Sequence, residues 1–145
     1  MRFHLLLLAA IAGALAVGCE KYEGPPLFPV SGTVTLDGKP LANAGVMFLP
    51  RGETRGNACL GITDASGKYS LRAEQGGGAG CQEGEFAVTI SKMKDPPPGA
   101  GGAAAAEAGT EETLPAKYWD SAQTVLSANV PNGGTTVDFQ LESKP

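Results

Sequence analysis

The stretch Gly61-Ile62-Thr63-Asp64-Ala65-Ser66-Gly67-Lys68-Tyr69-Ser70-Leu71 decides the fold of this chain. Apolar and polar residues alternate on both of its flanks, which is the period of a half-buried strand. Asp64 can accept hydrogen bonds from the backbone around the bend, and Gly67 can take the positive φ that closes it. We therefore predict a β-hairpin, with Leu60 and Ile62 facing the core.

The rest of the chain repeats this pattern of short alternating segments separated by turn residues. Glycine (21) and proline (11) are abundant among the 145 residues, which is typical of many short strands joined by tight turns. The sequence Pro131-Asn132-Gly133-Gly134 predicts a hairpin between the last two strands. With no helix between any two strands, the pattern predicts an all-β antiparallel sandwich in one domain. The seven expected strands cover residues 30–36, 46–49, 58–62, 69–71, 85–91, 124–130 and 135–141.

The alternation also predicts which side chains form the core. Those expected to face inward are Val30, Val34, Leu36, Val46, Phe48, Leu60, Ile62, Tyr69, Leu71, Phe86, Val88, Ile90, Leu126, Val130, Val137, Phe139 and Leu141.

Three segments carry a resemblance to a known family. These are VSGTVTLDGKPLANAGVMFLP at residues 30–50, the Thr63-Asp64 turn with its following aromatic strand, and the Gly84-Glu85-Phe86 strand start. They resemble the carboxypeptidase regulatory-like (transthyretin-like, prealbumin-like) domain. Leu114-Pro115-Ala116-Lys117-Tyr118 looks like an element of small exported, planctomycete-type lipoproteins with this domain. The resemblance implies a seven-stranded antiparallel transthyretin-like or Ig-like β-sandwich over residues 28–143, and it implies no peptidase activity.

The N-terminus predicts export. Arg2 and a following apolar run, shorter than a membrane span, are typical of a signal peptide over residues 1–18. The sequence that ends at Cys19 resembles a bacterial lipobox, although Ala16 stands where leucine is commonest. The resemblance implies lipidation of Cys19, a membrane anchor and a place in the cell envelope, on the periplasmic or outer-membrane face. The alternative is ordinary cleavage near Ala16, with a free thiol at Cys19. Residues 19–27, which include two prolines, then form a tether.

A segment of low complexity interrupts the fold at residues 95–113. It holds no apolar side chain larger than alanine, so it buries too little surface to offset its ordering entropy. We predict a disordered insert, in which residues 103–108 can form transient helix. Deleting residues 96–112 is then expected to leave the melting temperature nearly unchanged.

Few residues suit catalysis or cofactor binding. The only histidine, His4, lies in the leader, which removes Ser-His and Cys-His pairs and imidazole zinc sites from the mature chain. The acid pairs Glu83/Glu85 and Glu111/Glu112 lie in flexible segments, and the Asp64 turn lacks the further acids of a calcium loop. We therefore predict no catalytic residue, no metal site and no cofactor. The net charge of −4 without a basic patch argues against nucleic-acid binding.

Tyr118 and Trp119 are candidates for stacking on a sugar ring. Neighbouring residues of a strand point to opposite faces, so one of the two is expected to be a core residue.

Cys59 and Cys81 are the two cysteines left in the exported domain. Such a pair predicts a disulfide, with two free thiols as the alternative. If Leu60 and Ile62 face the core, Cys59 points outward, and the bridge is expected near the surface.

These observations favour a non-enzymatic envelope lipoprotein whose sandwich is a structural or protein-interaction module. A carbohydrate- or peptidoglycan-binding module is the alternative, and an uncharacterised hydrolase is a third hypothesis. The partners expected are the membrane, through the lipid anchor, and an envelope protein or glycan.

Overall fold

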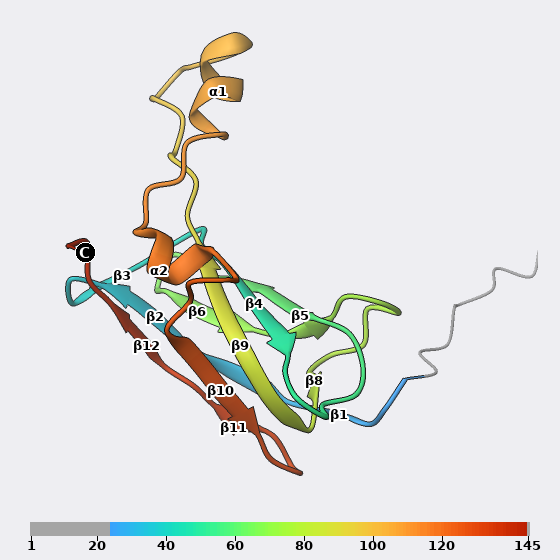
Figure 1. Cartoon of the computed structure of the whole chain (residues 1–145). Coiled ribbons are helices and arrows are strands. Elements are labelled where there is room, and N and C mark those ends of the chain that lie inside the picture. The colour runs from blue at the N-terminus through green and yellow to red at the C-terminus, as the bar shows by residue number, and fades with distance from the viewer. Residues whose placement is uncertain (1–23, 145) are drawn as a thin grey trace, which may run out of the picture.

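Two β-sheets pack face to face, and an arm projects from one end of the pair (Figure 1). The structure is a computed structural model that describes residues 24–144. The predicted leader and Cys19 lie outside this range. Within it, no helix is long and apolar enough to cross a membrane.

The larger sheet has the strand order β10-β9-β4-β5-β7, and all of its neighbours are antiparallel. Its strands alternate as the sequence predicts along β4 and β9, where Val46, Phe48 and Val88 are buried. The strands are β4 (Gly45–Pro50), β5 (Cys59–Ile62), β7 (Arg72–Ala73), β9 (Gly84–Ser91) and β10 (Leu126–Val130).

The second sheet is built around the long strand β2 (Val30–Leu36). The strands β3 (Lys39–Pro40) and β6 (Lys68–Ser70) pair with β2 in antiparallel orientation. The strands β11 (Thr135–Thr136) and β12 (Phe139–Leu141) pair with it in parallel. The prediction of a wholly antiparallel sandwich is therefore wrong at this point, because the last segment of the chain returns beside β2 in the same direction.

The predicted hairpin at residues 131–134 is also wrong. Its two flanking strands belong to different sheets, since β10 pairs with β9 and β11 pairs with β2. The loop crosses between the sheets and is fixed where Thr135 N–H donates to the carbonyl of Pro29 at 2.9 Å. A Cβ at Gly134 would lie 2.2 Å from the same oxygen, so this crossing requires glycine.

The central turn has the predicted chemistry but a different role. Asp64 Oδ1 accepts hydrogen bonds from the backbone N–H groups of Ser66 (2.8 Å) and Lys68 (3.0 Å), and Gly67 has φ +76°. Its flanking strands nevertheless do not form a hairpin, because β5 pairs with β4 and β7 while β6 pairs with β2. The buried Thr63 hydroxyl donates to Leu41 O at 2.6 Å, which directs the chain across from one sheet to the other.

The core lies between the two sheets, and most of the predicted core residues are buried in it. Leu36, Leu126 and Val137 are partly buried against it. The prediction is wrong for Leu60 and Ile62: Leu60 is only partly buried, and Ile62 is 74% exposed. The phase of β5 is shifted by one residue relative to the prediction, so that Cys59 faces inward and these two side chains face outward.

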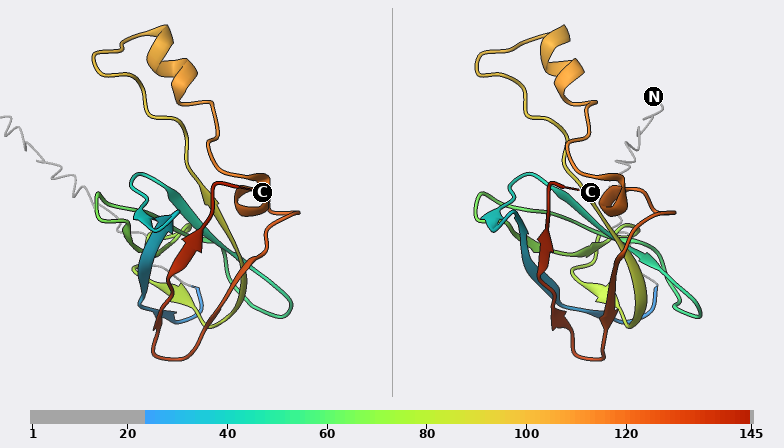
Figure 2. Two further views of the ribbon diagram at one scale, coloured as in Figure 1. Left: turned by 90° about the vertical axis from the view of Figure 1, so that its left-hand side faces the viewer. Right: turned by 60° about the vertical axis from the view of Figure 1, so that its left-hand side comes forward.

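The arm, residues 95–113, extends away from both sheets in each view of Figure 2. It carries the short helix α1 (Ala103–Ala108), in the place where transient helix was predicted. Its base differs from the prediction of disorder, because Met93 and Glu112 form an antiparallel bridge and Lys94 N–H donates to Glu111 O at 2.8 Å. Beyond the arm, helix α2 (Ala116–Trp119) packs against β9.

Candidate functional site

The Cys59–Cys81 disulfide is present, as predicted. It joins β5 to β8 (Cys81–Gln82), with Cα atoms 5.7 Å apart. Both cysteines are fully buried, so the expectation of a bridge near the surface is wrong. The cause is the shifted phase of β5, which turns Cys59 toward the core.

Gln82 lies beside the bridge and is only 1% exposed, although nothing in the sequence singled it out. Its Nε2 donates a 2.7 Å hydrogen bond to the carbonyl of Asn57, and its Oε1 lies 3.4 Å from Cys59 Sγ. A buried amide needs such partners, because an unpaired one costs about 1–3 kcal/mol. The side chain therefore connects the bridge to the loop of residues 51–57.

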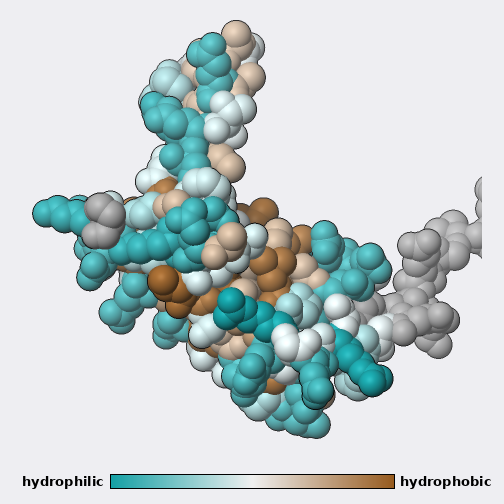
Figure 3. Space-filling view, viewed as in Figure 1, coloured by the Kyte–Doolittle hydropathy of each residue, from teal (hydrophilic) through white to brown (hydrophobic). Residues whose placement is uncertain are grey.

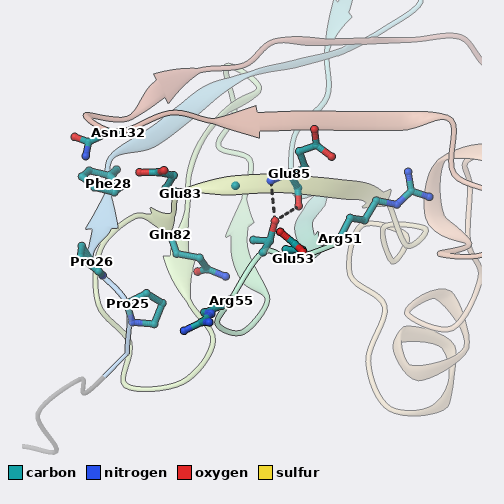
Figure 4. A pocket seen from close by; sticks show the side chains of 12 residues that line it. Pro25, Pro26, Phe28, Arg51, Glu53, Arg55, Gln82, Glu83, Glu85 and Asn132 are labelled. Atoms are coloured by element: carbon teal, nitrogen blue, oxygen red, sulfur yellow. Dashed lines mark hydrogen bonds between the residues drawn. The ribbon is translucent and has the colours of Figure 1, made fainter.

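An open cleft of about 670 Å³ lies next to Gln82 (Figure 4). We call it the N-terminal cleft, because Pro25, Pro26 and Phe28 form one wall of it. The loop of residues 51–57 forms the facing wall, and the start of β9 forms the floor. The residues that line it are Pro25, Pro26, Phe28, Arg51, Glu53, Thr54, Arg55, Gln82, Glu83, Gly84, Glu85 and Asn132.

Thr54 holds the loop wall against the floor. Its hydroxyl donates to the carbonyl of Glu85 at 3.0 Å and accepts from the N–H of the same residue at 2.9 Å. Gly84 has φ +142°, and a Cβ there would lie 2.5 Å from Thr54 Cγ2. Glycine at this position thus permits the close approach that shapes the cleft.

The cleft carries exposed charges of both signs. Arg51 and Arg55 lie on the loop with Glu53, and Glu83 and Glu85 lie on the floor. Among the residues that the structure describes, none of these five side chains forms an ion pair. Open, solvated charges of this kind suit reversible contact with polar groups, and they do not provide the buried environment that tunes a catalytic acid or base.

The remaining acidic candidates have structural contacts. Glu112 accepts hydrogen bonds at the base of the arm, and Glu111 pairs with Lys94 at 2.7 Å. Hydrogen bonds from Ser66 and Lys68 lower the pKa of the Asp64 carboxyl in its turn. Within residues 24–144 no group of three or more metal-ligating side chains occurs.

Tyr118 and Trp119 lie on α2 and not on a strand as expected. Tyr118 is buried, and its hydroxyl accepts the N–H of Glu142 at 3.1 Å. Trp119 is 42% exposed, and its Nε1 donates to Leu114 O at 3.0 Å. One member of the pair therefore belongs to the core, while the other presents a ring of fixed orientation to solvent.

The sequence reasoning missed an apolar surface on the outward side of the larger sheet. Leu60 lies opposite Met47 in the ladder, and Ile62 follows two residues later, so the three share one face. Figure 3 shows hydrophobic residues gathered where β4 and β5 lie. We call these three residues the open face. The alternation of apolar residues along β5 indicated that Leu60 and Ile62 share one face, but the prediction placed that face in the core.

Comparison with protein-family models and with curated proteins finds no match. Among solved structures, a DUF3823 family protein from Parabacteroides merdae ATCC 43184 is similar at a TM-score of 0.38 and 14% identity, over 81% of this chain and 46% of that one. A 9R-lipoxygenase from Cyanothece PCC8801 is similar at a TM-score of 0.35 and 13% identity, over 80% and 16% respectively. The chain thus spans less than half the length of either, and the likeness is distant and limited to β-rich structure.

Proposed function

We propose that this protein is a non-enzymatic lipoprotein, anchored in the cell envelope through Cys19, whose β-domain binds another protein through the open face. The observation that carries the proposal is the 74% exposure of Ile62, beside the partly buried Leu60 and Met47. Exposed apolar side chains that gather on one face are typical of interaction surfaces.

Within residues 24–144, the outward side of the larger sheet is buried more deeply at β9 than at β4 and β5. Helix α2 packs against β9, whose outward-facing Ala87 and Thr89 are buried. In the part of the chain that the structure describes, neither helix makes a comparable contact with the neighbouring β4 and β5, which carry the open face. Its side chains are aliphatic, and Arg72 and Glu74 border the groove beside Leu60 and Ile62 with opposite charges. An aliphatic surface with a mixed-charge border favours a protein partner.

The finer fold assignment is part of the same proposal. We assign the domain to the carboxypeptidase regulatory-like, transthyretin-like sandwiches on the strength of its two facing sheets and the Asp64–Gly67 turn between them. The parallel pairing of β12 with β2 is a departure from the seven-stranded antiparallel pattern expected of that family.

Photo-crosslinking in intact cells tests the interaction. A crosslinking residue in place of Leu60 is expected to capture one envelope protein, and adding Ile62→Lys is expected to abolish that capture. Val125→Lys is the matched control, because Val125 is 69% exposed but lies outside the open face. Equal capture in both lysine variants would reject the open face as the contact surface.

Fractionation tests the anchor separately. Cys19→Ala is expected to move the protein from the membrane fraction to the soluble one, because two or three acyl chains anchor almost permanently. Membrane retention of this variant would contradict lipidation while leaving the open face untouched.

A glycan-binding module is the second candidate, and it rests on Trp119. Its hydrogen bond to Leu114 fixes the ring, and such a preoriented aromatic plane can stack on a sugar. Binding to peptidoglycan in a pull-down, lost in Trp119→Ala but kept in Ile62→Lys, would favour this function over the first.

A further inference from the structure

The N-terminal strand belongs to a small sheet of its own. The strand β1 (Leu27–Phe28) pairs with β8 and with no other strand of the described chain. Each strand has two residues, and a ladder this short is at best marginally stable by itself. Something else must therefore hold it against the two main sheets.

On the β1 side, the chain continues through Pro29 into β2, and Phe28 packs against the core. On the β8 side, the Cys59–Cys81 bridge provides the covalent connection. Phe28 lies directly opposite Cys81 in the small sheet, and Cys81 is bonded to Cys59 in the larger one. Gly80 adds a hydrogen bond from its N–H to Leu71 O at 2.8 Å, and a Cβ at Gly80 would lie 2.3 Å from the carbonyl of Phe28. The covalent bridge thus lies next to a close backbone contact between the two strands.

The N-terminal cleft depends on the same bridge. Pro25, Pro26 and Phe28 form one of its walls from the segment around β1. The facing loop is held by the hydrogen bond of Gln82 to Asn57, and Gln82 follows Cys81 directly. Release of β8 would therefore free the segment around β1 and remove the Gln82 contact of the loop, which would keep only the Thr54 contact with Glu85. The core strands β2, β4 and β9 would keep their own partners.

We propose that the Cys59–Cys81 bridge keeps β1 docked on the domain and holds the walls of the N-terminal cleft in place. Without the bridge, the segments 25–28, 51–57 and 81–82 open, and the two main sheets stay folded. This role of the disulfide does not depend on the proposed partner or on lipidation.

Amide hydrogen exchange of the mature chain tests the proposal, because it reports local opening segment by segment. Two bridge-free samples are compared with the oxidised protein: Cys59→Ala/Cys81→Ala, and wild-type chain that has been unfolded, reduced and refolded in reductant. Exchange is expected to be at least about tenfold faster at Leu27 and Phe28, since Pro25 and Pro26 carry no amide hydrogen, and in residues 51–57, with β4 and β9 nearly unchanged. The fluorescence of Trp119, the single tryptophan, reports that the body is folded.

Gln82→Ala separates the bridge from the amide beside it. With the disulfide intact, this variant is expected to speed exchange in residues 51–57 and to leave Leu27 and Phe28 protected. The proposal is overturned if Leu27 and Phe28 remain equally protected without the bridge, or if exchange in β4 and β9 accelerates as much as exchange at Leu27 and Phe28. Failure of both bridge-free samples to fold would also overturn it, since the bridge would then support the whole domain.

Discussion

The hydroxyl of Tyr69 donates a 2.7 Å hydrogen bond to the carbonyl of Val137, across the central strand of the second sheet. Tyr69 lies opposite Gly32 in the ladder of β6 and β2. A Cβ at Gly32 would lie 2.9 Å from the Tyr69 ring and 1.7 Å from the Val137 oxygen. The absence of a side chain at residue 32 therefore lets Tyr69 connect β6 with the segment that leads into β12.

Gly32→Ala is expected to lower the free energy of unfolding by about 3 kcal/mol, because the added methyl group overlaps backbone that cannot move freely. Urea titration followed by the fluorescence of Trp119 measures the change. Gly101→Ala is the control, since nothing lies within 4 Å of a Cβ at that position. Similar stabilities of the two variants would contradict the close approach at Gly32.

The stability of the domain is expected to fall above pH 10.0. Burial, with a smaller effect of the Asp138 carboxylate, raises the pKa of the Tyr69 phenol above its ordinary value of 10.0. The folded state therefore favours the neutral phenol, and this contribution is complete below pH 10.0 and is lost as the pH rises above it.

Tyr69→Phe tests this titration. The variant is expected to lose about 1 kcal/mol at neutral pH, through the missing hydrogen bond. It should also show a shallower fall in unfolding free energy above pH 10.0 than the wild type. Parallel pH profiles for the two proteins would show that other groups cause the alkaline loss.

Glu112 at the base of the arm is expected to matter more than the neighbouring Glu111. Its Oε1 accepts backbone N–H groups from Lys92, Thr113 and Leu114 at 2.9–3.0 Å. Glu112→Ala leaves these donors without their acceptor and is expected to cost about 1–3 kcal/mol. Glu111→Ala removes only the exposed pair with Lys94, worth about 0.5 kcal/mol or less. Urea denaturation of both variants decides between them.

The role of Glu112 changes the expectation for deleting the arm. Removing residues 96–110 is expected to leave the melting temperature nearly unchanged, because no large apolar side chain is lost. Extending the deletion to residue 112 removes the Glu112 carboxylate and is expected to lower the melting temperature by about 5 °C or more. Calorimetry of the two deletions makes the comparison, and equal melting temperatures would show that Glu112 does not stabilise the base.

The sequence predicted local turn chemistry and burial better than it predicted which faces and strands meet. The Asp64–Gly67 turn and most of the core follow from short-range pattern, and both appear in the structure. The phase of β5 failed because Ile62 is apolar but faces outward, while Cys59 is buried by its bridge to a distant residue. Alternation shows that a strand has two faces, and it does not show which face the rest of the chain will cover.

Pairing between segments that are far apart in the chain was the feature that the sequence predicted least well. The parallel contact of β12 with β2 and the small sheet of β1 and β8 leave no mark in local sequence. Prediction of the candidate site from the sequence met the same limit. Cys59 and Cys81 were paired correctly, but Gln82 acquires its role only through the loop that carries Asn57. Turn residues specify where the chain bends, whereas the strands that meet afterwards depend on packing of the whole domain.

The buried disulfide is expected to resist reduction while the domain is folded. Because Cys59 and Cys81 are fully buried, a thiol reductant must wait for an opening of the surrounding segments before it can attack. Reduction in native buffer is expected to be slow and to accelerate strongly in denaturant. Once reduced, the domain is expected to be about 3 kcal/mol less stable, from the entropy that the closed loop removes from the unfolded chain.

Alkylation followed by mass spectrometry measures the fraction of reduced cysteines with time at several urea concentrations. Reduction in native buffer as fast as that of the unfolded chain would place the bridge at the surface, as the alternation around Leu60 first suggested. A reduction rate that rises with urea less steeply than the global unfolding equilibrium would instead report local opening, because opening of a small segment exposes less surface than unfolding of the whole domain. That intermediate dependence is the result expected if β1 and β8 separate from the body before the two main sheets come apart.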